Sequence, residues 1–393
     1  MKWNFMGLLF GECKGRQFSK PFRLYALGMV FCMLFTMMPM PVHAESTADA
    51  VLLAEARTGA VLSEENADMV LPVGSLAKLM TAYLTARAME NGELTKETVI
   101  TAGDAVTGIK GAVIWLEAGD SITVDELLMG MLAGNANDAA AVLAVRLSGS
   151  TEAFVMDMNA AAFDLGMRNT HFTSPQGYDD PLAYSTARDM GKLACALLEH
   201  EILLPYLTTW RTFIRGESVE IVNENTLTRT MEGCLGMKAA HSEDAGQCLI
   251  AACERDGMVC AAVVLGCEDE EERFSVAKRL LNSGFSNYKL TLPALAEEFL
   301  MPLAVEGGTE SAVLLELSEL PELAVPQSAA ELQTVLVLPE YVHAPVQAGQ
   351  AVGTVHFYHG ESLLCSVPLL AAEDVPVIGF PYAFRKVLRF FFT

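Results

Sequence analysis

The stretch Pro72-Val73-Gly74-Ser75-Leu76-Ala77-Lys78 places a serine and a lysine three residues apart, directly after a turn. Apolar residues follow at helical spacing, which predicts a long helix from Ser75 to about Asn91. Side chains three positions apart lie on one face of a helix, so the lysine can reach the serine hydroxyl. A neutral lysine can take the hydroxyl proton and make the serine a nucleophile.

The Ser-x-x-Lys pattern alone is weakly specific, because it occurs three times in the chain. Ser275 lies in a sequence typical of an ordinary amphipathic helix, and Ser286 follows Gly284 near a predicted helix end. Only Ser75 comes after a turn and opens an apolar helix, so we select it as the candidate nucleophile. The alternative is that Ser75 is a helix N-cap with no chemical role.

Length and charge narrow the possible classes of protein. The chain has 393 residues, 26 Lys and Arg, 49 Asp and Glu, and a net charge of −23. It is long enough for two domains. The acidic balance and the lack of a basic block argue against nucleic-acid binding. No sequence typical of a metal site or a phosphate-binding loop is present, so we expect no cofactor.

The first 44 residues predict export. Basic residues precede an apolar run at 24–40, and Val42-His43-Ala44 then offers a small-x-small cleavage site. The run is short for a membrane span. Residues 1–44 are therefore interpreted as a secretory signal peptide that is cleaved.

Nine cysteines raise the question of disulfides. Two lie in the predicted signal peptide and seven remain, which is an odd number. Several lie in apolar runs such as Cys248–Cys253. We interpret them as small buried hydrophobic residues in preference to a disulfide framework.

The pattern at 45–288 predicts an α/β (α+β) domain with a mainly antiparallel sheet and a helical subdomain. The expected strands are 50–55, 60–63, 213–222, 249–253 and 258–266. Besides the helix at Ser75, we expect a helical region at 124–147 that continues to 165 after a break at Ser148-Gly149-Ser150. Further helices are expected at 185–200 and 270–283.

The remainder of the chain divides into two parts. At 289–372, short apolar runs alternate with Pro, Gly and Ser, which predicts a small β-sandwich with strands at 312–317, 334–338, 352–356 and 363–369. At 378–393, apolar side chains share one helical face and basic ones fall elsewhere. The apolar residues are Phe380, Phe384, Val387, Leu388 and Phe391; the basic ones are Arg385, Lys386 and Arg389. This predicts an amphipathic helix on a membrane surface, the alternative being a helix docked on its own domain.

In this order, the parts of the chain resemble the serine-type D-alanyl-D-alanine carboxypeptidases, the low-molecular-mass penicillin-binding proteins. The resemblance covers nearly the whole chain and includes the stretches Leu165–Phe172, Tyr184–Met190, Asn223–Leu227 and Ala245–Leu249. It implies a penicillin-binding/β-lactamase-like transpeptidase domain followed by a small all-β domain. It also implies peptidoglycan stem peptides ending in D-Ala-D-Ala as substrates, β-lactams as covalent inhibitors, and a place at the outer face of the cytoplasmic membrane or in the cell wall.

The resemblance also implies roles for residues of the first two motifs. Ser75 would become acylated and Lys78 would be the general base. The family's Ser-x-Asn motif reads Asn135-Ala136-Asn137 here. Asn137 would hold in place either the acyl-side amide of the substrate or the side chain of Lys78. Asn135 replaces a serine thought to relay a proton, and an amide passes a proton on less readily.

The third motif, Lys-Thr-Gly in the family, reads Lys238-Ala239-Ala240. Lys238 would attract the substrate carboxylate, whereas Ala239 lacks the hydroxyl that would bind it. Ala240 adds a methyl group where glycine allows close approach of the substrate. The backbone N–H groups of Ser75 and His241 would form the oxyanion hole.

Two altered motifs leave three hypotheses. The first is an active or weakened carboxypeptidase, the second a non-catalytic wall-binding or regulatory homologue, and the third a β-lactamase. Losing one hydrogen bond to a charged group costs about 1.5–3 kcal/mol, or roughly ten- to a hundredfold in rate. The retained serine, the two lysines and Asn137 favour the carboxypeptidase. The β-rich domain and basic aromatic tail argue against the β-lactamase.

Overall fold

The computed structural model describes residues 47–295, 300–329 and 332–392, with side chains as far as residue 388. The predicted signal peptide at 1–44 lies outside the described residues. So does the side chain of Phe391.

A five-stranded antiparallel sheet forms the centre of the first domain. Its order is β2-β1-β9-β8-β7, from β2 (Val61–Glu65) through β1 (Ala50–Glu55), β9 (Met258–Cys267) and β8 (Gly246–Arg255) to β7 (Cys234–Ser242). All six residues of β1 are buried, as expected of a strand covered on both faces. The strand predictions at 50–55, 60–63, 249–253 and 258–266 are confirmed.

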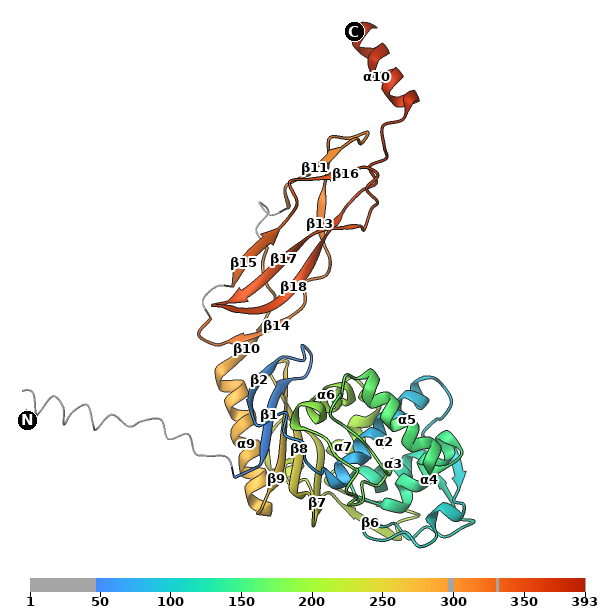
Figure 1. Ribbon diagram of the computed structural model, residues 1–393. Helices are drawn as coiled ribbons and strands as arrows, with labels where there is room; N and C mark the ends of the chain where they lie inside the picture. The colour runs from blue at the N-terminus through green and yellow to red at the C-terminus, as the bar shows by residue number, and fades with distance from the viewer. Residues whose placement is uncertain (1–46, 296–299, 330–331, 393) are drawn as a thin grey trace, which may run out of the picture. The chain divides into compact units, whose positions relative to one another are not determined.

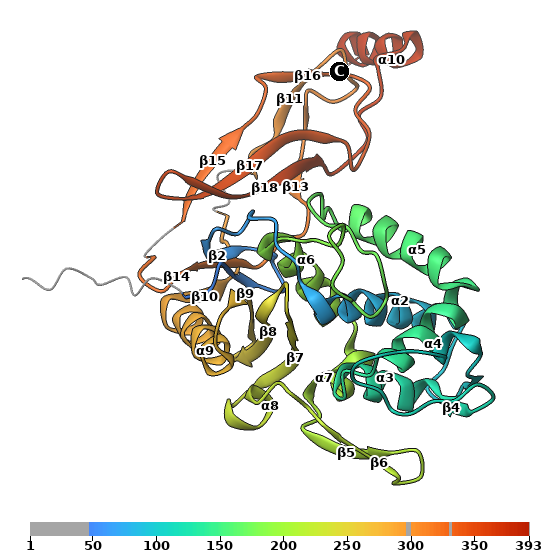
Figure 2. The same ribbon diagram turned by 60° about the horizontal axis from the view of Figure 1, so that its bottom comes forward.

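Helices cover both faces of this sheet (Figure 1). α9 (Glu270–Asn287) packs on one face through Val276, Ala277 and Leu281. The other face is covered by several helices, including α2 (Lys78–Glu90) and α6 (Ala187–Leu198), as Figure 2 also shows. The helices predicted at 185–200 and 270–283 are confirmed.

The helical region predicted at 124–147 is confirmed, and it holds two helices. α3 (Val124–Leu132) and α4 (Asn137–Ser148) are separated by four residues. Asn135 in this break has a φ of +58°, a left-handed conformation that is incompatible with a continuing helix. The predicted break before α5 (Thr151–Asp164) is confirmed, with Ser150 as its N-cap.

The strand region predicted at 213–222 is confirmed, and it holds two strands. The chain forms a hairpin of β5 (Arg211–Ile214) and β6 (Val219–Val222). Three consecutive residues with positive φ, Arg215, Gly216 and Glu217, make the turn. The smaller elements of the domain are β3 (Val99–Thr101), η2 (Asp104–Val106), β4 (Ser121–Thr123), η3 (Glu201–Leu203), α7 (Leu204–Thr208) and α8 (Leu227–Thr230).

The predicted all-β domain is confirmed. Its strands pair as β12-β11-β16, β13-β18-β17-β15 and β10-β14. Their bounds are β10 (Tyr288–Thr291), β11 (Leu303–Glu306), β12 (Ala312–Val313), β13 (Leu315–Leu317), β14 (Leu323–Pro326), β15 (Gln333–Val337), β16 (Tyr341–His343), β17 (Ala351–His359) and β18 (Ser362–Ala371). The predicted strands at 334–338, 352–356 and 363–369 are thus confirmed, and 312–317 holds two strands.

The chain ends in a helix, α10 (Phe380–Phe392). Among the described helices, none alone is long and apolar enough to cross a membrane. The pair α4 and α5, bent by 84°, passes that test only when taken together.

Candidate active site

Ser75 lies in a short 3₁₀ helix, η1 (Gly74–Ala77), which leads directly into α2. The N-cap of this element is Val73 and no side chain caps it, so the N-cap alternative for Ser75 is wrong. The Ser75 hydroxyl oxygen is buried and has no hydrogen-bond partner among the described residues. A buried hydroxyl without a partner lowers stability, which points to a functional reason for its presence.

Two contacts position the turn that carries Ser75. Gly74 and Gly177 both have positive φ, and a Cβ atom on Gly177 would overlap the Gly74 carbonyl oxygen. A Cβ atom on Gly74 would lie 3.3 Å from the Ser242 hydroxyl oxygen at the end of β7. The serine is therefore held between the loop at Gly177 and the edge strand of the sheet.

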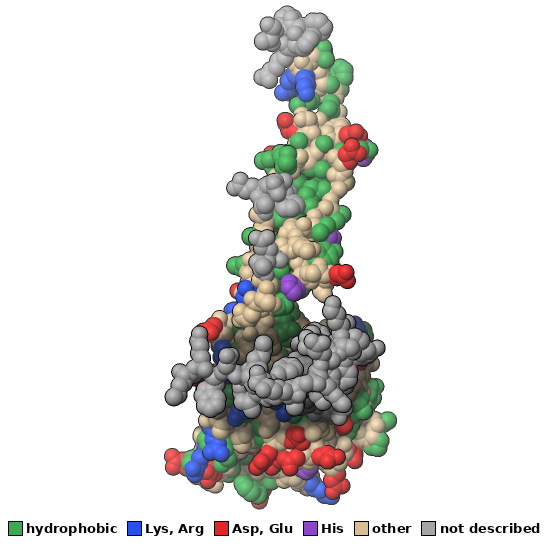
Figure 3. Space-filling view, turned by 90° about the vertical axis from the view of Figure 1, so that its left-hand side faces the viewer, with side chains coloured by type: hydrophobic (Ala, Val, Ile, Leu, Met, Phe, Trp, Pro, Cys, Tyr) green, Lys and Arg blue, Asp and Glu red, His purple; other side chains and the backbone are tan. Residues whose placement is uncertain are grey.

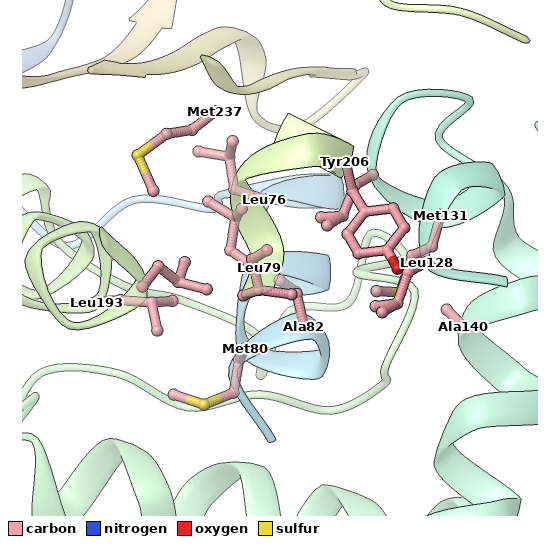
Figure 4. Close-up of a cluster of buried hydrophobic side chains, with 14 of the residues drawn as sticks. Leu76, Leu79, Met80, Ala82, Leu128, Met131, Ala140, Leu193, Tyr206 and Met237 are labelled. Atoms are coloured by element: carbon pink, nitrogen blue, oxygen red, sulfur yellow. The ribbon is translucent and has the colours of Figure 1, made fainter. Parts of the chain in front are cut away.

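The apolar face of η1 and α2 anchors the same turn. Leu76 and Leu79 are fully buried and point into the core, which also contains Leu193 of α6 and Met237 of β7 (Figure 4). Because residues 75 and 78 fall on a different face from residues 76 and 79, this packing leaves the serine and the lysine free of the apolar cluster.

Lys78 is 1% exposed, and its Nζ donates a hydrogen bond to the Gln176 carbonyl oxygen at 3.0 Å. Burial, and next the positive charge of Lys238, hold the pKa of Lys78 well below its usual value of 10.5, while Glu224 opposes this shift. A lowered pKa increases the neutral fraction of the Lys78 amine at any given pH, which favours its use as a base.

The second motif lies at the break between α3 and α4. Asn137 donates through Nδ2 to the Lys110 carbonyl oxygen at 2.6 Å. Of the two alternatives for Asn137, the substrate's acyl-side amide and Lys78, the contact with Lys78 is not among the hydrogen bonds of the described residues. The side-chain oxygen of Asn135 is buried without a partner there, as the Ser75 hydroxyl is. The motif therefore presents an unpaired acceptor, Asn135 Oδ1, where a serine would present a hydroxyl.

Lys238 connects the third motif to the end of α3. Its Nζ lies 3.4 Å from the Leu132 carbonyl oxygen and 3.5 Å from that of Met131, so the third motif lies close to the second. Burial lowers the pKa of Lys238 to about 8, against an opposing effect of Glu224. At neutral pH this residue is therefore mostly a buried cation.

The residues after Lys238 form the free edge of the sheet. Among the described strands β7 pairs with β8 alone, so its other edge offers backbone groups to an extended ligand. Ala239 packs in the apolar cluster on the α9 face, and Ala240 packs in the cluster on the other face. His241 is exposed at the end of this run, with Nδ1 at 3.3 Å from the Gly246 carbonyl oxygen.

Sequence reasoning missed two residues of this site. Arg273 of α9 is buried and donates through Nη1 to the Ala240 carbonyl oxygen at 2.8 Å, while its Nε has no partner among the described residues. Gln176 fixes Lys78 through its backbone. The amphipathic pattern of α9 does not indicate that Arg273 faces the sheet. The contact of Gln176 is made by its backbone carbonyl oxygen, which any residue type would supply, so no sequence pattern indicates it.

Together these residues can carry out acyl transfer: an unpaired hydroxyl, a neutral amine, a buried cation and an open strand edge. Among the described His, Cys, Asp and Glu side chains, no group of three or more is placed to hold a metal ion.

Known proteins share this architecture and sequence. The family model for D-alanyl-D-alanine carboxypeptidase matches residues 37–269, and that for the C-terminal domain of penicillin-binding protein 5 matches residues 297–377. D-alanyl-D-alanine carboxypeptidase DacC of Escherichia coli is 32% identical over 380 residues, covering 93% of this chain and 94% of the relative.

Two solved structures extend the comparison. Penicillin-binding protein 5 of Haemophilus influenzae superposes with a TM-score of 0.77 at 26% identity, over 84% of this chain and 98% of that one. The ampicillin-bound form of penicillin-binding protein D2 of Listeria monocytogenes gives a TM-score of 0.56 at 30% identity, over 61% of this chain and 98% of that one.

Proposed function

The chain belongs to the D-alanyl-D-alanine carboxypeptidase family, and from this premise we propose that it hydrolyses the bond before the terminal D-alanine of peptidoglycan stem peptides. The observation that supports this most directly is that the buried Ser75 hydroxyl, which has no hydrogen-bond partner among the described residues, lies one helical turn from a lysine of lowered pKa.

In the acylation step, neutral Lys78 takes the proton of the Ser75 hydroxyl as the oxygen attacks the carbonyl carbon of the penultimate D-alanine. The backbone N–H groups of Ser75 and His241 stabilise the negative oxygen that forms. The C–N bond then breaks, Lys78 returns its proton to the leaving amine, and D-alanine departs. The serine retains the acyl group as an ester.

In the deacylation step, water replaces the departed amine. Lys78 takes a proton from the water as it attacks the ester carbon, and the Ser75 oxygen leaves and regains a proton. The shortened stem peptide is released and the enzyme returns to its starting state.

Positive charge near β7 serves substrate binding. Lys238 and Arg273 are both buried cations that contact β7 or belong to it. A substrate lying along the free edge of β7 ends in a carboxylate, which these cations attract. Because Ala239 supplies no hydroxyl, the cations carry more of this recognition than in a chain with threonine there.

One observation favours a second candidate, a catalytically degenerate homologue that binds the wall. Asn135 and Ala239 replace two hydroxyl residues of the family's motifs, and Ala240 replaces a glycine. Such a protein would keep the fold and bind stem peptides without turnover.

The test is covalent labelling followed by product release. A fluorescent penicillin should attach to the peptide that contains Ser75, and a D-Ala-D-Ala peptide should release D-alanine. Labelling without release would favour the degenerate homologue, and a Ser75→Ala variant that labels as well as the wild type would overturn the role of Ser75 as the nucleophile.

We further infer that the protein is exported and that α10 attaches it to the outer face of the membrane. Phe380 is 81% exposed, and Phe384 and Val387 are each 53% exposed. Arg385 and Lys386 are exposed on the same helix, and basic side chains gather at this end of the space-filling view (Figure 3). Aromatic side chains combined with basic ones suit the interface of an anionic membrane.

Deletion of residues 380–393 tests this attachment. The shortened protein should no longer sediment with vesicles of phosphatidylethanolamine and phosphatidylglycerol, yet should be labelled by penicillin as fast as the full chain. The variant Phe380→Ser/Phe384→Ser should behave in the same way, whereas Val335→Ser, an exposed apolar change elsewhere in the β-rich domain, should not. Unchanged vesicle binding after the deletion would contradict the inference.

A further inference from the structure

Three cysteines lie side by side across the sheet on the face that α9 covers. Cys234 of β7 is directly opposite Cys253 of β8, and Cys253 is directly opposite Cys260 of β9. All three contact the same apolar cluster, and all are free thiols. Cys253 therefore has two possible partners, and the hydrogen-bond pattern of the sheet distinguishes them.

Cys234 and Cys253 occupy a non-hydrogen-bonded pair. The Glu254 amide donates to the Gly233 carbonyl oxygen at 2.8 Å, which makes the neighbouring position the hydrogen-bonded one. The Cys234 amide donates instead to Met231, within its own chain segment. Hydrogen-bonded and non-hydrogen-bonded pairs alternate along an antiparallel ladder, and side chains approach most closely in the second kind.

Cys253 and Cys260 occupy the other kind of pair. The two-residue turn Asp256-Gly257 joins β8 to β9, with positive φ at both positions. Arg255 and Met258, which flank such a turn, form a hydrogen-bonded pair, so the pair two residues further along is again hydrogen-bonded. Cβ atoms are further apart there, whereas a disulfide needs a Cβ–Cβ distance of about 3.5–4.5 Å.

We propose that Cys234 and Cys253 are a dithiol site that closes to a cross-strand disulfide by exchange with a small-molecule disulfide. The two thiols differ in a way that suits this reaction. Cys234 is partly exposed, and a hydrogen bond with the Cys253 thiol lowers the pKa of Cys234. Cys253 is buried, and the same hydrogen bond, together with burial, raises its pKa.

The reaction takes place in two exchanges. The Cys234 thiolate attacks one sulfur of an external disulfide RSSR, forming a Cys234–S–S–R mixed disulfide and releasing RS⁻. The Cys253 sulfur then attacks the Cys234 sulfur, loses its proton, and releases the second R group as RSH. Two protein thiols are oxidised and one external disulfide is reduced to two thiols.

The bond would anchor the strand that carries Lys238. Within the described part of the chain β7 has one neighbouring strand, β8, and Cys234 is the first residue of β7, four positions before the lysine. A disulfide between residues 234 and 253 lowers the conformational entropy of the unfolded chain. The midpoint temperature of thermal unfolding should therefore rise by about 5 °C on oxidation. Formation of this disulfide does not depend on the proposed catalytic activity. It depends on the proposed function only in that export would place the protein in an oxidising compartment.

The experiment treats the purified, reduced protein with glutathione disulfide and maps its peptides by mass spectrometry. We expect a linked pair of peptides containing Cys234 and Cys253, lighter than the two reduced peptides by two hydrogen atoms. The variant Cys260→Ser should form the same link and show the same thermal shift. The variant Cys253→Ser should stop at a glutathione adduct on Cys234 and show no shift.

Three outcomes would overturn the proposal. These are a link between residues 253 and 260, a lasting glutathione adduct on Cys234 of the wild type, and no reaction at Cys234. If a serine variant fails to fold, the linked peptide of the wild type still decides the matter.

Discussion

The Nζ atom of Lys78 lies 3.0 Å from the backbone carbonyl oxygen of Gln176, a residue 98 positions further along the chain. Close by, the Thr81 hydroxyl donates to the Pro175 carbonyl oxygen, also at 3.0 Å. Two residues of α2 are thus bound to consecutive carbonyl groups of one loop. The Lys78 amine is thus oriented by a hydrogen bond to this loop and not by one to Ser75. Because Lys78 donates in this bond, the lone pair of its neutral form stays available to accept a proton.

Replacing Ser75 by alanine should abolish penicillin labelling without loss of stability. The hydroxyl caps no helix and has no hydrogen-bond partner among the described residues, so its removal breaks no bond. We expect the free energy of unfolding to change by less than about 0.5 kcal/mol or to increase. Urea unfolding and gel fluorescence measure the two effects.

The matched control is Ser275→Ala. Ser275 lies in α9 and its hydroxyl donates to the Glu271 carbonyl oxygen within that helix. Its replacement should leave labelling intact. A Ser75→Ala variant destabilised by about 1 kcal/mol or more would restore the N-cap interpretation.

Replacing Gly177 by alanine should disrupt the turn that carries Ser75. The added methyl group would overlap the Gly74 carbonyl oxygen, at a residue whose φ is already positive. Gly257→Ala is the control, because Gly257 has a φ of +80° and no heavy atom within 4 Å of an added Cβ. The control should lose about 1–2 kcal/mol through strain alone, and Gly177→Ala should lose more.

Acylation kinetics then separate the two glycine variants. Gly257→Ala should be acylated at the wild-type rate, whereas Gly177→Ala should be slowed at least tenfold where it remains folded. Equal stability losses and equal rates in the two variants would show that the Gly177 contact does not position Ser75.

The sheet and the main helices were predictable because their signals are local. β1, β8 and β9 are continuous apolar runs, and α6 and α9 have clear apolar periodicity. The break between α3 and α4 lies at Gly134-Asn135, and both residue types are unfavourable in a helix. The apolar residues on either side nevertheless favoured a single helical region, and only the tertiary structure shows the left-handed conformation of Asn135.

Those residues of the site that belong to a sequence motif could be predicted from the sequence. Ser75, Lys78 and Lys238 follow from spacing and resemblance, and the structure gives each lysine an environment that lowers its pKa. Arg273 did not follow, because only the packing of α9 on the sheet brings its guanidinium to the Ala240 carbonyl oxygen. Contacts between distant segments carry no local pattern.

Replacing Arg273 by methionine should weaken recognition of the substrate carboxylate. We expect kcat/KM for a D-Ala-D-Ala peptide to fall roughly ten- to a hundredfold, the value of one charge-assisted hydrogen bond. An ester substrate without that carboxylate should be affected much less. The exposed Arg279→Met, on the same helix, should match the wild type. An equal loss for both substrates would mean that Arg273 only supports the strand.

Lys238 should make stability depend on pH in alkaline solution. Its pKa is about 8 in the folded protein and 10.5 ordinarily, so between these values the unfolded chain binds more protons. The free energy of unfolding contributed by this residue therefore rises as pH increases from 8 to 10.5. Lys238→Met should lack this rise, which urea unfolding at a series of pH values measures. Parallel pH dependences in wild type and variant would contradict the lowered pKa.

Glu224 should set the pH range of acylation. The rate requires Lys78 neutral and Lys238 protonated, so it should increase as Lys78 loses its proton and decrease above about pH 8. The negative charge of Glu224 raises the pKa of both lysines. Glu224→Gln removes that charge, so both pKa values fall and the whole bell-shaped profile should move to lower pH.

The shift is best measured on the alkaline side. Above pH 8 the Glu224→Gln variant should be acylated about two- to fivefold more slowly than the wild type, as expected for one charge acting across a partly solvated site. Glu340→Gln, an exposed change in the β-rich domain, should leave the profile unchanged. If Glu224→Gln instead lowered the rate equally at every pH, the carboxylate would act on substrate binding and not through the two lysines. A profile displaced to higher pH would contradict this charge arrangement, because loss of a nearby negative charge lowers the pKa of a lysine and does not raise it.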